Sequence, residues 1–146
     1  MGKILNIKIK TVNTTIERQK VTYVYNTEKQ VICIKDGDTN KWFTYHPNNK
    51  PSSYRFKDNK RWYLKKYDLN GNEIYHKDSS GFIYEKTYDA NGNCLSYKTN
   101  RGYNETFIYN DLNQLVYWNN SKGDEEINTY SPNGKLIACV KKYARR

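Results

Sequence analysis

Two short stretches of aspartate, asparagine and glycine are the first residues whose spacing could support chemistry. They read Asp68-x-Asn70-Gly71-Asn72 and Asp89-x-Asn91-Gly92-Asn93. A calcium-binding EF-hand loop needs glycine at its sixth position and a bidentate glutamate at its twelfth. The sixth position here is Glu73 or Cys94. Asn-Gly after aspartate tolerates the positive φ angles of tight hairpin turns, so these stretches predict turns and no metal site.

The histidines and cysteines show no catalytic or metal-binding spacing. His46 and His76 have no partner at a motif distance, and Cys33, Cys94 and Cys139 are widely separated, with no Cys-x-x-Cys. A zinc site or a disulfide framework needs closer sets of ligands or paired cysteines. We therefore interpret the cysteines as reduced strand residues and expect a protein that is not an enzyme and needs no cofactor.

A basic segment interleaved with aromatic residues is the main candidate for binding. On a strand, Arg55 and Lys57 would project from one face, and after a turn Arg61, Tyr63 and Lys65 would share a face. Pairing of the two strands is expected to bring four or five cations together. Such a surface suits a phosphate backbone with stacked bases, or an acidic protein, although a solvated face is the alternative. The candidate partner-binding residues are Arg55, Lys57, Lys60, Arg61, Trp62, Tyr63, Lys65 and Lys66.

Large aromatic residues elsewhere form a second set of candidates. Trp42, Tyr117 and Trp118 lie in segments that alternate like strands. In a single-layer sheet both faces of a strand cannot be core, so these rings are expected either to anchor an interface or to be covered by curling of the sheet.

Tyrosine and glycine recur at a fixed spacing along the chain, and this repeat must position the candidate residues. Tyrosines recur every 21 residues at Tyr67, Tyr88, Tyr109 and Tyr130, and Gly81, Gly102 and Gly123 keep the same step. Tyr45 and Tyr25 extend the series upstream at steps of 22 and 20 residues, without the glycine. Between the turns, segments of about six to eight residues alternate in polarity, as half-buried strands do.

Composition limits the fold to a thin structure. Hydrophobic residues make up 36% of the 146 residues and aromatic residues 15%, including 15 tyrosines. Helix formers with a heptad pattern are absent, which favours strands. We expect one all-β domain over residues 1–146, with N-terminal strands in residues 1–24 (Leu5, Ile7 and Ile9 alternate there) and six tyrosine-led repeats in residues 25–146. The predicted fold is an antiparallel meander of about six hairpins that forms a twisted or curled sheet or an open, barrel-like roll.

The unit Tyr-Asp-x-Asn-Gly-Asn, with glycine about 14 residues after the tyrosine, resembles the YD repeat of RHS-type proteins. Units starting at Tyr67 and Tyr88 match well, those at Tyr109 and Tyr130 match partly, and the earlier units are degenerate. The resemblance implies β-hairpin strips, which in large members coil into a shell around a toxin domain; some members are linked to carbohydrate binding. This chain is too short to enclose a toxin, so the resemblance supports the hairpin geometry and leaves the function open.

Charge and composition indicate a binding protein. The net charge is +10, and no apolar run approaches the length of a membrane helix or forms a secretory signal. We expect a cytoplasmic protein, and a composition typical of AT-rich genomes points to a phage or mobile element. The function expected is docking on a host protein or nucleoprotein, such as a defence complex, with inhibition or adaptation of it. Direct nucleic-acid binding and carbohydrate binding are the alternatives, and the oligomeric state is left open.

Overall fold

The computed structural model describes the backbone of residues 8–13 and 20–145 and the side chains of residues 21–145, and every regular element in it is a β-strand. Leu5 and Ile7 of the predicted N-terminal strands lie outside the described residues, whereas Ile9 lies on the first strand. No helix that is long and apolar enough to cross a membrane occurs in the described part of the chain. The strands are β1 (Lys8–Asn13), β2 (Lys20–Tyr25), β3 (Val31–Asp36), β4 (Thr39–Tyr45), β5 (Pro51–Lys57), β6 (Trp62–Tyr67), β7 (Glu73–Asp78), β8 (Ile83–Tyr88), β9 (Cys94–Thr99), β10 (Asn104–Tyr109), β11 (Leu115–Asn120), β12 (Glu125–Tyr130) and β13 (Leu136–Lys142).

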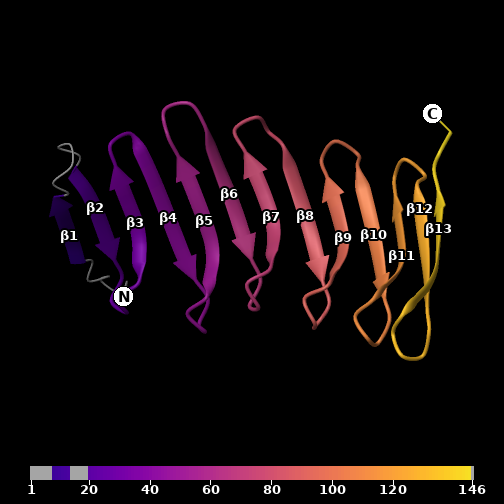
Figure 1. Cartoon of the computed structure of the whole chain (residues 1–146). Coiled ribbons are helices and arrows are strands. Elements are labelled where there is room, and N and C mark those ends of the chain that lie inside the picture. Colours follow the sequence, from indigo (N-terminus) through magenta and orange to yellow (C-terminus); the bar gives the residue numbers. More distant parts are fainter. Residues whose placement is uncertain (1–7, 14–19, 146) are drawn as a thin grey trace, which may run out of the picture. The chain divides into compact units, whose positions relative to one another are not determined.

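The chain divides into two compact units. The N-terminal unit, Met1–Gly81, contains β1 to β7, and the C-terminal unit, Phe82–Arg146, contains β8 to β13. Inside each unit every strand pairs antiparallel with the strands before and after it in the sequence, so the arrows in Figure 1 alternate in direction. The prediction of an all-β antiparallel meander built from hairpins is confirmed.

Each repeat tyrosine is the last residue of a strand and lies at a β-bulge. The register shifts at Tyr25, Tyr45, Tyr67, Tyr88, Tyr109 and Tyr130. The fourth residue after each tyrosine has a positive φ angle, whether it is glycine or not. Glycine fills this position in three repeats, whereas Lys29, Asn49 and Asn113 adopt φ angles of 64°, 64° and 58° in the others. These three repeats therefore keep the turn although they have no glycine at this position.

The residue after the tyrosine holds most of these turns together with its side chain. Asp68 Oδ1 accepts hydrogen bonds from the backbone N–H groups of Asn70 and Asn72, each at 2.9 Å. Asn26, Asp89 and Asn110 make the same pair of bonds in their own turns. This is the Asx-turn pattern, in which a short polar side chain replaces a backbone acceptor. A short carboxylate or amide at this position therefore specifies the turn in these four repeats.

Consecutive turns of the same unit are bonded to one another. Asn48 Nδ2 donates to the Leu69 carbonyl at 2.8 Å, and Gln114 Nε2 donates to the Gly134 carbonyl at 2.6 Å. The tyrosines contribute as well, because the Tyr45 hydroxyl donates to the Val31 carbonyl at 2.7 Å. Each hairpin is thus held by its neighbours, as expected for a repeat whose units do not fold alone.

The sheets have almost no conventional core. Cys33 is the one buried hydrophobic residue among those described, at 7% exposure, and Asn128 is the one buried polar residue. Both faces of the strands are therefore partly open to solvent, and stability must come from cross-strand side-chain pairs and the backbone ladder. This outcome matches the thin structure expected from the low apolar content.

We expect that replacing glycine at the turn position of positive φ lowers the free energy of unfolding, and that introducing glycine there does not. Gly71 has a φ of 95°, and an added Cβ would meet no atom within 4 Å, so Gly71→Ala should cost about 1 kcal/mol of backbone strain alone. Lys29→Gly should be neutral or slightly stabilising, because it relieves the same strain. Urea unfolding followed by the fluorescence of Trp42 and Trp62 measures both. Equal destabilisation by the two substitutions would contradict this account of the turn.

Candidate basic face of the N-terminal unit

The register of the N-terminal unit separates its side chains into two faces. Residues directly opposed on antiparallel strands project to the same side, and successive residues alternate. One face carries three rows that run across the strands, here called the basic face. The rows are Val24–Cys33–Trp42–Arg55–Leu64–Lys77, Thr22–Lys35–Asn40–Lys57–Trp62 and Thr44–Ser53–Lys66–Tyr75.

Cations and aromatic rings alternate on the basic face. The cations are Lys35, Arg55, Lys57, Lys66 and Lys77, and all except Lys77 are exposed. Trp42, Trp62 and Tyr75 lie between them and are half-buried. Neighbouring strands are about 4.8 Å apart, and alternate residues along one strand are about 6.6 Å apart, so adjacent cations lie within one screening length at physiological salt. A positive potential must therefore build up over this face.

Two of the cations rest on rings of the same face. The Arg55 guanidinium carbon lies 5.4 Å from the centroid of the Trp42 ring, and Lys66 Nζ lies 5.2 Å from the Tyr75 ring. Cation–π contacts at exposed sites contribute about 0.5–1 kcal/mol each. They also fix each cation over the face of a ring.

The basic face carries no acidic residue in its three rows. Within the described residues, no salt bridge involves Lys35, Arg55, Lys57, Lys66 or Lys77. The acidic groups Asp36 and Asp78 belong to rows on the opposite face. The positive charge is therefore not neutralised within this part of the molecule and is available to an anion.

The opposite face, here called the aromatic face, stabilises the unit. Its rings form a chain in which Phe43 and Tyr54 lie 5.1 Å apart, Tyr54 and Tyr63 5.7 Å, and Tyr63 and Phe56 5.0 Å between centroids. Burial, reinforced by a hydrogen bond with Tyr63, raises the pKa of Tyr54 to about 12. Lys65 Nζ donates to Glu73 Oε2 at 2.7 Å, and this hydrogen bond raises the pKa of Lys65.

The turn between β5 and β6 is organised by one carboxylate. Asp58 Oδ1 accepts hydrogen bonds from the N–H groups of Lys60 and Arg61 at 2.8 Å each, and Arg61 Nε donates to Oδ2 at 3.3 Å. These bonds, the one from the Lys60 N–H first, lower the pKa of Asp58. Arg61 is 72% exposed along its side chain and lies 5.6 Å above the Phe56 ring. The turn thus carries two further cations at one end of the sheet.

The structure divides the predicted binding residues among three places. Arg55, Lys57, Trp62 and Lys66 share the basic face, whereas Tyr63 and Lys65 lie on the aromatic face and Lys60 and Arg61 lie in the turn. The expected single cluster of four or five cations from this hairpin is therefore wrong, because Arg55 pairs with Leu64 and not with a residue of the Arg61–Tyr63–Lys65 set.

Sequence reasoning missed three contributors to the basic face. Lys35, Tyr75 and Lys77 come from strands outside the basic segment, and Trp42 was named only as a separate aromatic candidate. The signal that could have found them is the tyrosine itself, because a bulge at each repeat tyrosine fixes the offset between neighbouring strands.

The other two aromatic candidates, Tyr117 and Trp118, lie on opposite faces of the C-terminal unit. Tyr117 lies in an exposed row, Ile108–Tyr117–Ile127–Val140, in which the three aliphatic residues are 49%, 49% and 61% exposed. Trp118 lies on the other face, opposite Phe107 and Glu126, and lines a hollow of about 370 Å³ with Phe107 and Tyr143. The two neighbouring rings therefore face in opposite directions.

The two histidines contact neighbouring strands and turns, and the three cysteines are unpaired strand residues. His46 Nε2 donates to the Tyr67 carbonyl at 2.9 Å, and His76 stacks on Tyr63 at 6.0 Å between centroids. Cys33, Cys94 and Cys139 are free and lie on strands. No group of three or more histidine, cysteine or acidic residues that could hold a metal ion occurs in the described residues.

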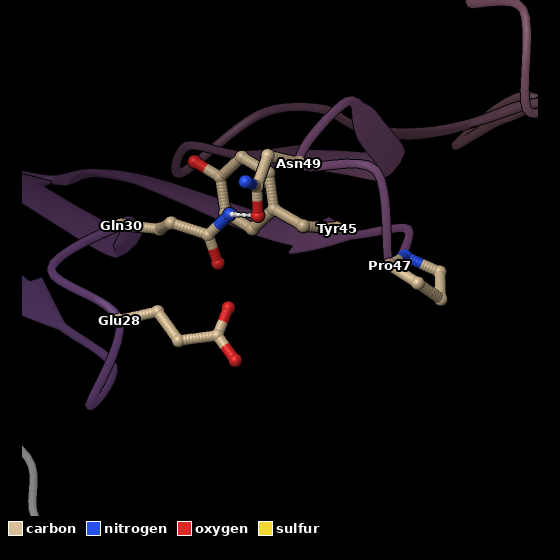
Figure 2. Close-up of a pocket in the computed structure, with 5 residues that line it drawn as sticks. All are labelled: Glu28, Gln30, Tyr45, Pro47 and Asn49. Carbon is tan, nitrogen blue, oxygen red and sulfur yellow. Dashed lines mark hydrogen bonds between the residues drawn. The ribbon is translucent and has the colours of Figure 1, made fainter.

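A polar hollow lies at the turn end of the N-terminal unit. It has a volume of about 620 Å³ and is lined by Glu28, Gln30, Tyr45, Pro47 and Asn49 (Figure 2). Gln30 Nε2 donates to Asn49 Oδ1 at 3.0 Å across two turns, and the Tyr45 hydroxyl bonds a backbone carbonyl. These polar groups hold neighbouring turns together, and the hollow contains none of the predicted binding residues.

The fold is similar to part of three solved structures that contain TcdB2-TccC3. Crystal structures of TcdB2-TccC3-Cdc42 and TcdB2-TccC3 match 94% and 91% of this chain, each with a TM-score of 0.53 and 10% sequence identity. A structure of TcdB2-TccC3-TEV matches 91% of it with a TM-score of 0.52. This chain spans about 8% of the length of those chains. At 10% identity this likeness shows a shared β-repeat fold and nothing further.

No protein-family model matches the chain, and neither does any curated protein sequence. The likeness to the solved structures therefore concerns the arrangement of strands alone.

The lowered pKa of Asp58 predicts how the basic turn responds to acid. A carboxylate with a folded pKa below its unfolded value stabilises the fold above the unfolded pKa of about 3.9, and this contribution is lost as the pH falls through the folded pKa. An NMR titration of the Asp58 carboxyl carbon should therefore give a midpoint below that of an unfolded peptide, and Arg61→Gln should raise it. A midpoint at or above the peptide value would contradict the hydrogen bonds described.

Proposed function

We propose that this protein is a non-catalytic binding protein that docks on a negatively charged macromolecule through the basic face. The observation that carries the proposal is the set of five cations without an acidic neighbour in their rows. A charged face of this kind accelerates encounter with a polyanion and releases counterions on binding.

A nucleic-acid strand is the polyanion that the geometry favours. Trp42, Trp62 and Tyr75 interrupt the cations at strand spacing. Proteins that bind single strands without sequence preference combine a basic track with aromatic rings on which bases stack. We therefore place a single strand across the strands of the sheet, with its phosphates at Arg55, Lys57 and Lys66.

We predict salt-dependent binding of a fluorescein-labelled oligothymidylate of about 20 nucleotides. Fluorescence anisotropy at about 50 to 200 mM salt should give a slope near −3 for the logarithm of the binding constant against the logarithm of the salt concentration. Each phosphate contact on a single strand contributes about −0.7, and the basic face has the exposed cations Lys35, Arg55, Lys57 and Lys66. The triple variant Arg55→Gln/Lys57→Gln/Lys66→Gln should reduce the magnitude of the slope by about two units. The fluorescence of Trp42 and Trp62 should be quenched when the strand binds.

A second triple variant separates the surface from the overall charge. Lys98→Gln/Lys122→Gln/Lys135→Gln removes the same charge from exposed positions of the C-terminal unit. It should leave the slope nearly unchanged. Equal losses in the two triple variants, or no binding by the unmodified chain at low salt, would contradict a nucleic-acid site on the basic face.

A protein partner is the second candidate, and the exposed row of the C-terminal unit favours it. Ile108, Ile127 and Val140 are about half exposed or more and flank Tyr117 across four strands. Contiguous exposed apolar residues on a rigid sheet commonly mark protein interfaces. Docking on a host protein or nucleoprotein, with inhibition or adaptation of a defence complex by a phage-encoded protein, is the role proposed for this row.

We predict that Ile108→Ser/Ile127→Ser abolishes capture of a host complex by the tagged protein. The control Leu69→Ser/Leu112→Ser removes exposed aliphatic residues from turns and should leave capture intact. Affinity purification with mass spectrometry measures both, and thermal denaturation verifies that each variant is folded. Capture that survives the first double variant would exclude this row as the interface.

We also propose that the chain is a short version of the YD repeat. The tyrosine–glycine period and the β-repeat fold shared with the TcdB2-TccC3 structures support this relation. Carbohydrate binding, which the same resemblance raised, would use Trp42 or Trp118. Trp118 lines a hollow with Phe107 and Tyr143, which could hold a sugar ring. Loss of salt-insensitive glycan binding in Trp118→Ala would favour that role.

A further inference from the structure

The aromatic face of the N-terminal unit carries a hollow that the proposed docking does not use. It has a volume of about 510 Å³, within the range of small-molecule sites. Five of its lining residues have apolar or aromatic side chains, and Lys41 supplies its one charge. The lining residues are Ile34, Lys41, Phe43, Pro51, Tyr54, Tyr67 and Gly71.

A pair of stacked rings forms one wall of this hollow. Phe43 and Tyr54 are directly opposed on β4 and β5, and their rings lie 5.1 Å apart with an angle of 28° between planes. Tyr54 is held in turn by Tyr63, so its ring is fixed by neighbours on both sides. Rigid aromatic walls favour a flat aromatic ligand, because ring–ring contacts contribute about 0.5–1.5 kcal/mol beyond the area they bury.

Lys41 gives the hollow a preference for negative charge. It lies on β4, opposite Ile34 and Phe56, and no ion pair involving its ammonium group occurs in residues 21–145. Phe43 is two residues further along the same strand, so the Cα atoms of Lys41 and Phe43 are about 6.6 Å apart. A ligand with a ring and a carboxylate separated by a short chain would span that distance.

Lys41 is the charged group of this face that the hollow can offer to a ligand. Lys65, the other lysine on this face, is already bonded to Glu73 at 2.7 Å. Asp36 and Asp78 project from the same face but do not line the hollow, and Asp78 lies 3.9 Å from His76. The single charge in the lining, Lys41, therefore matches a ligand with one negative group.

We propose that the hollow binds a small arylalkanoic acid, with its ring against Phe43 and Tyr54 and its carboxylate on Lys41. The site is independent of the basic face, since Lys41 belongs to none of the rows of that face. Binding here would give the protein a small-molecule ligand in addition to a macromolecular partner.

The experiment is an NMR titration of the ¹⁵N-labelled protein with three probes. They are 4-phenylbutyrate, the uncharged 4-phenylbutan-1-ol, and butyrate, which lacks the ring. Phenylbutyrate should shift the amide signals of Phe43, Tyr54 and Gly71 and bind about fivefold or more tightly than the alcohol, because a contact to a charged group is worth more than a neutral one. Butyrate should cause no shift at the same concentration.

Two lysine variants decide the role of the charge. Lys41→Gln should make the acid and the alcohol bind equally, whereas Lys35→Gln, on the neighbouring strand but on the basic face, should leave the fivefold preference unchanged. The dispersion of the amide spectrum verifies that each variant is folded. Phe43→Leu should weaken both ring-bearing probes to the same extent.

Three results would overturn the proposal. One is equal affinity of the unmodified chain for the acid and the alcohol. Another is an unchanged preference for the acid in Lys41→Gln. The third is the absence of shifts at Phe43 and Tyr54 while signals elsewhere respond. Each of these leaves the nucleic-acid measurements on the basic face unaffected, so failure of this site is distinguishable from failure of the docking proposal.

Discussion

The register between neighbouring strands is the constraint on which this structure depends. A tyrosine at a bulge, followed four residues later by a residue of positive φ, closes each hairpin at one end of the sheet. Because side chains alternate with a period of two, a slip of one residue would exchange the two faces of a strand. With only Cys33 and Asn128 buried among the described residues, no deep core exists to correct such a slip. The turns therefore carry the specificity that a hydrophobic core supplies in thicker folds.

The same register explains how one thin sheet holds two kinds of chemistry. Phe43, Tyr54, Phe56 and Tyr63 gather on one face and provide most of the ring contacts of the N-terminal unit. That packing offsets the repulsion among the cations on the other face, where threonine, serine and asparagine separate the charges. A surface rich in unpaired cations destabilises the folded state through repulsion among the charges. The basic face is therefore the feature of this molecule that most needs a partner to explain it.

The sequence predicted the architecture better than the surface. The period of tyrosine and glycine was sufficient to predict hairpins, because turn chemistry is local and Asp-x-Asn-Gly encodes it directly. The composition of each face was not predictable in this way, since it depends on the offset between strands. The turn at Asp58 pairs Lys57 with Trp62, which places Tyr63 and Lys65 on the face opposite Arg55, whereas the registers of the neighbouring hairpins bring Lys35 and Lys77 onto the face of Arg55. The repeats at Tyr25 and Tyr45 were predicted as hairpins, but the positive φ angles of Lys29 and Asn49 were not, because lysine or asparagine replaces glycine there.

The most direct test of this account is the pairing of β5 with β6 in solution. Cross-strand nuclear Overhauser effects should join Phe56 to Tyr63 and Arg55 to Leu64, as the register requires. That result would place Arg55 and Lys57 on the face opposite the ring chain. Effects joining Phe56 to Leu64 and Arg55 to Lys65 would instead reveal a register one residue away. The cations would then share a face with Lys65, and the separation into a basic and an aromatic face would be contradicted.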